Sequence, residues 1–434
     1  MTNNRQWMAT AACLMVTWAA AAQAAVPTAG IAEHGAFAKP DGETFFVLSL
    51  QAQFTTQADR GVDIVVFFDT SASQTAIYRD KGLAALEDLM ATLPAQDKVC
   101  LYAVDVEPVE ISPPWVAPQS GDMKTALAAM KRRTPLGATD MSLAMETAAR
   151  LFAQLKPSNR GRAVLYIGDG MSAVHIMQPE EVGKRMAKLV EQRAPFSSYS
   201  IGPRRDNELL GALANHTGGY LVIDYPDKEA KGYARDLSVI AHGEVAWPTA
   251  FKLPPQVVEV FPKQFPPLRS DRETILIGRG KFTEPFQVSA TVDYFGQKAP
   301  LVWQVEPQKP QEDHAPLADL VTRCRPSDGI SLPTCGKAAL VEVYRVLDKN
   351  VSKLLKLAET ALATKNADQA EILANQVLAQ DPRNLEAQAL LTAVEKRRKG
   401  FFNVPDTKLK LGPNTPKKDS PDKTPPKLKL TPTK

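Results

Sequence analysis

The stretch VDIVVFFDTSAS, residues 62–73, decides the fold of this chain. Its apolar run from Ile64 to Phe68 leads directly into Asp69, and hydroxyl side chains follow at Ser71 and Ser73. A continuous apolar run that ends in small polar residues predicts a β-strand buried on both faces. The strand would deliver a carboxylate and two hydroxyls to one tight turn. These are hard oxygen ligands of the kind that Mg²⁺ and Mn²⁺ prefer, although taken alone they also fit a helix cap or an ordinary turn.

Outward from this stretch, apolar strands alternate with amphipathic helices. Strands are expected at residues 62–68, 98–104, 162–167, 196–201 and 219–223. Helices are expected at residues 78–93, 122–133, 141–155, 179–193 and 207–216. This alternation predicts a doubly wound, Rossmann-like α/β domain with a mainly parallel sheet, whose ligand crevice lies at the carboxyl ends of the strands.

Two further features are expected at the same edge of the sheet. The strand at 162–167 ends in Gly168-Asp169-Gly170, and the loop TPLGATD, residues 134–140, brings Thr139 to the start of a helix. Each has an ordinary explanation by itself, since Thr and Asp are common helix N-caps. Their order and placement together are more specific. They predict a metal site that separate elements assemble from Asp69, Ser71, Ser73, Thr139 and Asp169.

With these three parts in this order, residues 60–243 resemble the von Willebrand factor type A domains and their metal-ion-dependent adhesion site. The segment LLGALANHTGG, residues 209–219, also resembles the penultimate helix of that family and the turn after it. The resemblance implies one Mg²⁺ or Mn²⁺ held by the Ser71 and Ser73 hydroxyls. It implies that the other three residues contribute directly or through water, and that a carboxylate of a protein partner takes the open coordination position. A site with only two carboxylates leaves Mg²⁺ electrophilic enough to accept that group.

Basic and imidazole side chains near this site have two interpretations. Lys131, Arg132 and Arg133 precede the Thr139 loop and would attract an acidic partner, but basic residues at a helix end usually complement the helix dipole and remain solvated. The second interpretation is favoured. His175 follows Asp169 closely and is expected to be a surface residue.

The regions that flank the α/β domain have a different pattern. Residues 45–54 alternate as a half-buried antiparallel strand after a flexible start, and residues 244–307 contain short segments typical of a small β-sandwich. The phrase FPKQFPPLRSDRETILIGRGK, residues 261–281, resembles the β-region that follows the A domain in proteins similar to the inter-alpha-trypsin inhibitor heavy chains. The strand within residues 25–59 is therefore expected to join the sandwich, with residues 60–243 inserted between strands of one β domain.

The C-terminal third is expected to hold a linker, helices and a tail. Residues 308–337 are predicted to be a linker with a disulfide between Cys324 and Cys335. Residues 338–399 have helical periodicity and resemble one tetratricopeptide repeat in Asn366-Ala367-Asp368, Ala370, Pro382, Asn384 and Ala387. A single repeat does not build a groove, so both a packing hairpin and a peptide-binding unit remain open. Residues 400–434 are rich in Lys, Pro and Thr and are expected to be disordered.

The first residues predict export. One Arg, an apolar stretch over residues 8–22 and small residues at Ala22 and Ala24 are typical of a signal peptide, residues 1–24, with cleavage after Ala24. A membrane anchor is the alternative, but the run is short and rich in Ala. No other segment is expected to span a bilayer, so the mature protein is predicted to be secreted or periplasmic. Cys100 is expected to be a buried, inert thiol, and no two of the five dispersed His residues have the spacing of zinc ligands, so no zinc site is expected.

The charge is unevenly distributed. The formal charge of the chain is +4, but the stretch from Lys396 to the end contributes +9 and Arg5 contributes +1, which leaves about −6 for residues 25–395. This distribution gives no support for nucleic-acid binding by the folded part. The basic tail would either solubilise the chain or contact an anionic envelope surface or an acidic protein.

These features favour a non-enzymatic, exported module for metal-dependent protein binding. The sequence has no Gly-x-Ser-x-Gly elbow, no phosphate-binding Gly loop and no evident general base near Asp69. A metal-dependent hydrolase is therefore the less favoured alternative. The other alternative is a structural envelope scaffold that acts through the helical repeat and the basic tail.

Overall fold

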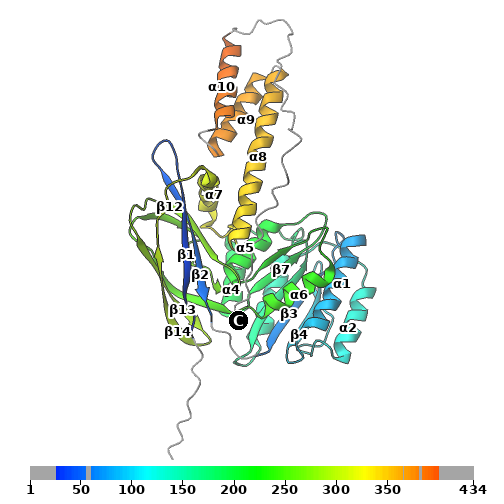
Figure 1. Ribbon diagram of the computed structural model, residues 1–434. Coiled ribbons are helices and arrows are strands. Elements are labelled where there is room, and N and C mark those ends of the chain that lie inside the picture. The colour runs from blue at the N-terminus through cyan, green and yellow to red at the C-terminus, as the bar shows by residue number, and fades with distance from the viewer. Residues whose placement is uncertain (1–25, 55–59, 365, 381–383, 400–434) are drawn as a thin grey trace, which may run out of the picture.

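The computed structural model describes residues 26–54, 60–364, 366–380 and 384–399. The predicted signal peptide and the basic tail lie outside these residues. No helix within the described part of the chain is both long and apolar enough to span a bilayer. In Figure 1 two antiparallel sheets lie on the left, an α/β domain lies on the right, and a helical arm extends upward.

The α/β domain is built on a six-stranded sheet with the order β5-β4-β3-β6-β7-β8. Its parallel strands are β3 (Val62–Asp69), β4 (Lys98–Val104), β6 (Gly161–Gly168), β7 (Phe196–Ser200) and β8 (Leu221–Ile223), and β5 (Pro108–Glu110) runs antiparallel to β4. Every residue of the central strand β3 is buried. The prediction of a parallel α/β sheet is therefore confirmed.

Helices cover both faces of this sheet. One face carries α1 (Ala76–Thr92), α2 (Gly121–Arg132) and α6 (Ala230–Ala241), and the other carries α3 (Met141–Ala153), α4 (Pro179–Glu191) and α5 (Asn207–Thr217). Val66 packs in the core of the first face and Val65 in the core of the second. Successive residues of β3 thus face opposite hydrophobic layers, which explains why the strand is apolar without alternation.

Two four-stranded antiparallel sheets share a second hydrophobic core. The first has the order β1-β2-β12-β10 and the second β11-β9-β13-β14. Their bounds are β1 (Thr28–Ala38), β2 (Thr44–Gln53), β9 (Val245–Lys252), β10 (Val257–Phe261), β11 (Leu268–Arg269), β12 (Thr274–Gly280), β13 (Phe286–Tyr294) and β14 (Gln297–Val305). Leu48 of β2, Val288 of β13 and Trp303 of β14 meet in the shared core. Because β2 pairs with β12, the α/β domain is inserted into this β unit between β2 and β9.

Strand β1 replaces the flexible start expected for the N-terminal residues. Its sequence, TAGIAEHGAFA, contains several small residues and no clear alternation of polar and apolar side chains. Its structure depends on a long antiparallel pairing with β2, from Thr28 opposite Gln53 to Ala38 opposite Thr44. The cause is tertiary, so local sequence does not reveal it. Helix α6 was likewise not expected, and its sequence contains Gly232 near its start and the charged pair Arg235 and Asp236 between its buried positions.

The span 308–337 is more ordered than the predicted linker. Within it, α7 (Pro316–Cys324) packs Leu317, Leu320 and Val321 against the outer face of the β1-β2-β12-β10 sheet. A 3₁₀ turn (Arg325–Ser327) follows. The helix adds a third layer to the β unit.

The predicted disulfide between Cys324 and Cys335 is wrong, because both residues are free, buried thiols. Cys324 lies at the end of α7 within the apolar cluster under that helix. Cys335 lies beside the Arg272 guanidinium, whose positive charge acts on the thiol. The two side chains therefore belong to different environments. Burial raises the pKa of Cys324 to about 12 and also raises the pKa of Cys335, so both remain protonated.

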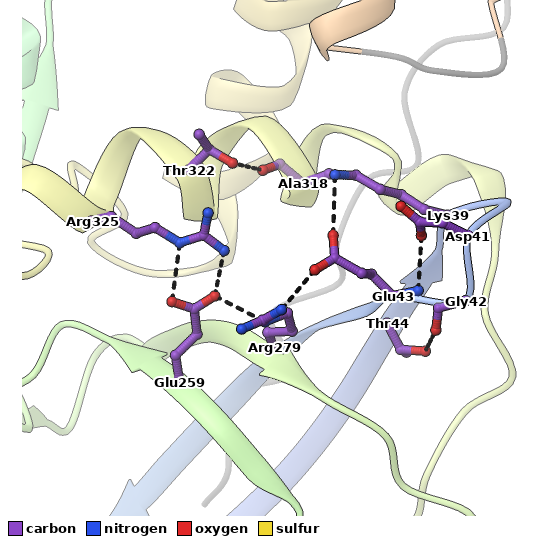
Figure 2. A network of polar contacts seen from close by, with 10 residues as sticks. All are labelled: Lys39, Asp41, Gly42, Glu43, Thr44, Glu259, Arg279, Ala318, Thr322 and Arg325. Carbon is purple, nitrogen blue, oxygen red and sulfur yellow. Dashed lines mark hydrogen bonds and ion pairs between the residues drawn. The ribbon is translucent and has the colours of Figure 1, made fainter.

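A network of ion pairs fixes the end of α7 to the sheet below it (Figure 2). Arg279 of β12 contacts Glu43 Oε1 at 2.6 Å and Glu259 Oε1 at 3.2 Å. Arg325 contacts the same oxygen of Glu259 at 2.6 Å, and these hydrogen bonds hold the pKa of Glu259 below its usual value. One carboxylate thus joins the β10 and β12 strands to the turn after α7.

The helical arm in Figure 1 consists of α8 (Lys337–Ala363), α9 (Ala367–Gln380) and α10 (Leu385–Arg398). Small side chains, Ala358, Ala374 and Ala387, meet at its centre together with Leu355, Val377 and Leu390. Small residues at the contact allow the three helices to approach closely. The resemblance of this arm to a tetratricopeptide repeat remains an interpretation of the sequence.

Two buried arginines join the β unit to the α/β domain. Arg269, whose exposed fraction is 1%, donates to the carbonyls of Gly218 (2.9 Å) and Ile240 (3.0 Å). Arg272 donates to the carbonyls of Gly219 (3.0 Å) and Ala214 (3.1 Å). These carbonyls lie at the carboxyl ends of α5 and α6, where the helices leave acceptors unpaired and carry partial negative charge.

Replacing Arg269 by alanine should destabilise the protein strongly. The change removes the guanidinium donors to the Gly218 and Ile240 carbonyls and the ion-pair partner of Asp271, and it should lower the free energy of unfolding by about 3 kcal/mol. Thermal unfolding followed by circular dichroism measures the effect. The control is Arg345→Ala, which removes an exposed guanidinium paired with Glu342 on the same helix and should leave the melting temperature unchanged. Equal melting temperatures for both variants would contradict this role of Arg269.

Candidate metal centre

The site lies where β3 and β6 end side by side. The two strands pair in parallel up to Phe68 opposite Ile167, so that Asp69 and Asp169 reach the same edge. The chain continues from β3 to β4 on one side, whereas β6 lies on the other side of β3. Ligands of open α/β sheets bind at such a reversal of strand order. Asp69 and Asp169 have exposed fractions of only 0% and 1%.

The structure brings all five predicted residues together in one hydrogen-bonded group. Ser71 Oγ lies 2.9 Å from Ser73 Oγ, and Ser73 Oγ donates to Asp169 Oδ2 at 2.6 Å. On the other side of the group, Thr139 Oγ1 donates to Asp69 Oδ1 at 3.1 Å. The backbone N–H of Ser71 closes the turn by donating to Asp69 Oδ1 at 2.8 Å.

Backbone hydrogen bonds hold the Thr139 loop against the turn after β3. Ala72 N donates to the Gly137 carbonyl at 3.0 Å, and Leu136 N donates to the Thr70 carbonyl at 2.9 Å. The next residue, Asp140, is the N-cap of α3 and accepts from Leu143 N at 3.1 Å. The N-cap interpretation of this loop thus applies to Asp140, which leaves the Thr139 hydroxyl facing Asp69.

Two further side chains complete the site, and the sequence analysis did not identify them. Tyr166 OH donates to Asp69 Oδ2 at 2.6 Å, and Gln74 Nε2 donates to Asp169 Oδ2 at 3.2 Å. Gln74 also donates to the Ile201 carbonyl at 3.1 Å, which ties it to the strand beyond β6. For Tyr166 the available signal was a lone phenol among the aliphatic residues that end β6, next to the predicted ligand Asp169.

Gly168 is required for the close approach of these groups. A Cβ atom at this position would lie 2.4 Å from Asp69 Cβ and 2.5 Å from Tyr166 OH. Both distances are far below van der Waals contact. The glycine that precedes Asp169 thus makes room for the carboxylate and phenol of its neighbours.

The site concentrates negative charge in a dry environment. Burial, followed by repulsion from Asp169, raises the pKa of Asp69 to about 6, although hydrogen bonds from Tyr166 and Ser71 act in the opposite direction. None of the ion pairs among the described residues involves either carboxylate. Two buried carboxylates and three hydroxyls without a protein cation fit a hard divalent cation, whose charge would offset theirs.

Three of the basic and imidazole residues near the site, Arg133, Lys131 and His175, are engaged in other contacts. Arg133 binds Asp105 Oδ2 at 2.7 Å and Thr70 Oγ1 at 3.2 Å, and so braces the turn after β3. Lys131 pairs with Glu87 at 2.5 Å. His175 lies on the surface, where its Nε2 is 2.9 Å from Glu181 Oε2.

The family model of the von Willebrand factor type A domain matches residues 62–223. These residues form a von Willebrand factor type A domain. The matched range contains all five residues of the site. Such A domains often serve as protein-binding or adhesion modules and often bind a divalent cation at this edge.

Several solved structures are similar to the chain. A von Willebrand factor type A protein from Catenulispora acidiphila has 14% sequence identity and a TM-score of 0.45, and the alignment covers 81% of this chain and 87% of that one. The ArnB paralog VWA2 from Sulfolobus acidocaldarius has 12% identity, a TM-score of 0.42 and coverages of 86% and 98%. The pilus adhesin SpaC from Lactobacillus rhamnosus GG has 12% identity, a TM-score of 0.35 and coverages of 62% and 46%. No curated protein sequence matches the chain.

The raised pKa of Asp69 predicts a pH-dependent stability of the metal-free protein. Between about pH 4 and pH 6 the folded state keeps a proton on Asp69 that the unfolded chain releases. The contribution of Asp69 to the free energy of unfolding should therefore fall by roughly 3 kcal/mol as the pH rises through this range. The variant Asp69→Asn does not titrate, so in EDTA it should be more stable than the wild type above about pH 6.

The measurement is the difference in melting temperature between variant and wild type across this pH range. The control is Asp227→Asn, which makes the same change at an exposed aspartate outside the hydrogen-bonded group of the site. A pH-independent difference for Asp69→Asn would show that Asp69 ionises normally in the folded state.

Proposed function

We propose that this chain is an exported, non-enzymatic protein-binding module that captures a carboxylate of a protein partner through Mg²⁺ or Mn²⁺ at the A domain. The observation that carries the proposal is the pair of buried carboxylates, Asp69 and Asp169, which share one edge with three hydroxyls and form no ion pair among the described residues. When bound, the cation supplies positive charge and an open coordination position for an acidic group.

The residues of the site have separable roles in this proposal. Asp69 and Asp169 supply charge, and Ser71, Ser73 and Thr139 supply neutral oxygens. The Ser73 and Thr139 hydroxyls now donate to carboxylates, and the Ser71 hydroxyl is paired with that of Ser73, but all three can rotate to present their lone pairs. Tyr166 and Gln74 are positioning residues. Each keeps one oxygen of a carboxylate in a fixed orientation, as outer partners of metal ligands commonly do.

The same contacts favour binding over hydrolysis. The side chains that hydrogen-bond to the two carboxylates are hydroxyls, a phenol and an amide, and none of these is an effective general base near neutral pH. His175, the nearest imidazole in sequence, is directed to Glu181. Export remains part of the proposal on the strength of the signal-peptide pattern in residues 1–24.

Loss of Asp69 should abolish metal binding and partner capture. In Asp69→Ala, Mn²⁺ binding measured by isothermal titration calorimetry should be lost, and an immobilised variant should retain no Mg²⁺-dependent protein from an envelope extract. The wild type in EDTA should behave in the same way, whereas Asp227→Ala should match the wild type in Mg²⁺. Undiminished Mn²⁺ affinity of Asp69→Ala, or capture that persists in EDTA, would disprove the mechanism.

The variant Tyr166→Phe tests the positioning role. It removes only the hydroxyl that donates to Asp69 Oδ2, so the fold should persist while Mn²⁺ affinity falls about 10- to 100-fold. The matched control is Tyr102→Phe, because that phenol donates to Glu110 away from the site. Equal Mn²⁺ affinities for the two variants would exclude a role of Tyr166 at the metal.

A further inference from the structure

Exposed apolar side chains surround the metal edge of the A domain. Residues 62–223 contain eight large apolar side chains that are exposed, and seven of them lie on the loops of this edge or in the first helical turns that follow. The seven are Ile77, Val106, Leu136, Leu143, Met171, Val174 and Ile176. We refer to them as the apolar ring. The exposed fractions of Ile77, Leu136 and Ile176 reach 71%, 73% and 80%.

Hydrogen bonds place these loops directly beside the metal ligands. Met171 N donates to Asp169 Oδ1 at 3.0 Å, and Val174 N donates to the Thr139 carbonyl at 3.4 Å. Leu136 belongs to the loop that is bonded to the turn after β3, as described above. The backbone of each loop is thus fixed while its apolar side chain faces solvent. Exposed apolar groups that gather at one place on a soluble domain mark an interaction site.

The ring lies on both sides of the site. Leu136 and Val106 lie on the side of β3 and β4. Their two loops are in contact, since a Cβ atom added at Gly137 would lie only 3.1 Å from Val106 Cγ2. Met171 and Ile176 lie on the side of β6. If a carboxylate of the partner is bound at the centre, the partner residues before and after it would therefore both lie over apolar surface of the A domain.

On the β6 side the ring continues into a groove of about 570 Å³. The groove begins at Met171, two residues after Asp169, and runs along α4 and α5 to the turn after α7. Its apolar lining includes Met171, Ile176, Met177, Val182, Leu209 and Ile330. The charged residues that line it, Asp206 and Glu208, are both acidic. The two acidic residues would repel a second carboxylate of the partner, and the mainly apolar lining suits an apolar side chain.

From this arrangement we propose that the partner is a protein segment with one carboxylate flanked on both sides by large apolar residues. The carboxylate binds at the metal, the residues on one side cover Leu136 and Val106, and an apolar residue on the other side enters the groove at Ile176. The inference rests on the proposed function and specifies the partner of the same site. Burial of such flanking side chains supplies affinity that a single carboxylate lacks.

Three synthetic fluorescent peptides test the proposal against the full chain by fluorescence anisotropy. The first has a central Asp with Leu and Phe on both sides, the second has the same Asp between Ser and Gly, and the third has the apolar flanks with Asn in place of Asp. In Mg²⁺ the first peptide should bind at least tenfold more tightly than either of the others. EDTA and Asp69→Ala should abolish its binding.

Variants of the ring localise the contact. Leu136→Ser and Ile176→Ser alter exposed side chains, so each variant should retain the fold and the wild-type Mn²⁺ affinity. Each should bind the first peptide at least fivefold more weakly than the wild type does. The control is the variant Val302→Ser. Val302 is an exposed residue of β14 outside the A domain, so this variant should bind the peptide as the wild type does.

The outcomes separate this inference from the proposed function. Equal binding of apolar-flanked and polar-flanked Asp peptides in Mg²⁺ would overturn the inference and leave the metal mechanism intact. The metal mechanism would be overturned if the wild type did not bind Mn²⁺. It would also be overturned if the Asn peptide bound as tightly as the Asp peptide with the same apolar flanks. Concentration-dependent dimers that disappear in Ile176→Ser would assign the ring to a second copy of this chain and would also overturn the inference.

Discussion

The structure of the candidate site depends on one electrostatic constraint, the burial of Asp69 and Asp169 beside each other at the ends of paired strands. The parallel register of β3 and β6 makes this proximity unavoidable. Hydroxyl, phenol and amide donors reduce the cost, but burial and mutual repulsion still raise the pKa of Asp69. The fold therefore holds two carboxylates in a position where the charge of a divalent cation would offset theirs.

The apolar ring adds selectivity to this charge. A cation with an open position accepts any accessible carboxylate, whereas the exposed side chains around it discriminate between the residues that flank that carboxylate. Arg133 is paired with Asp105 and Lys131 with Glu87, so two of the three basic residues near the Thr139 loop are already bound to carboxylates. In the proposed complex, selectivity would therefore come from hydrophobic burial on the apolar ring more than from attraction by Lys131 and Arg133.

The sequence was sufficient for the features that rest on strong local patterns. Strand β3 and helix α3 begin where the apolar runs predict, and the five site residues lie at or just after strand ends, or just before a helix start, that are visible in the sequence. The site partners Tyr166 and Gln74 escaped notice because their roles arise from strand register and a side chain that spans two loops. Strand β1 depends on pairing with β2, and α7 depends on packing against that sheet. The disulfide was predicted from the spacing of Cys324 and Cys335, which carries no information about the direction of either side chain.

The insertion of the A domain into the β unit has a mechanical consequence. The chain enters the domain after β2 and returns at β9, and both strands belong to the same pair of packed sheets. A pulling force applied at the metal edge is therefore divided between two covalent tethers, while Arg269 and Arg272 grip the ends of α5 and α6 close to where the chain returns. A domain attached in this way resists swivelling under load, unlike a domain suspended from a single linker.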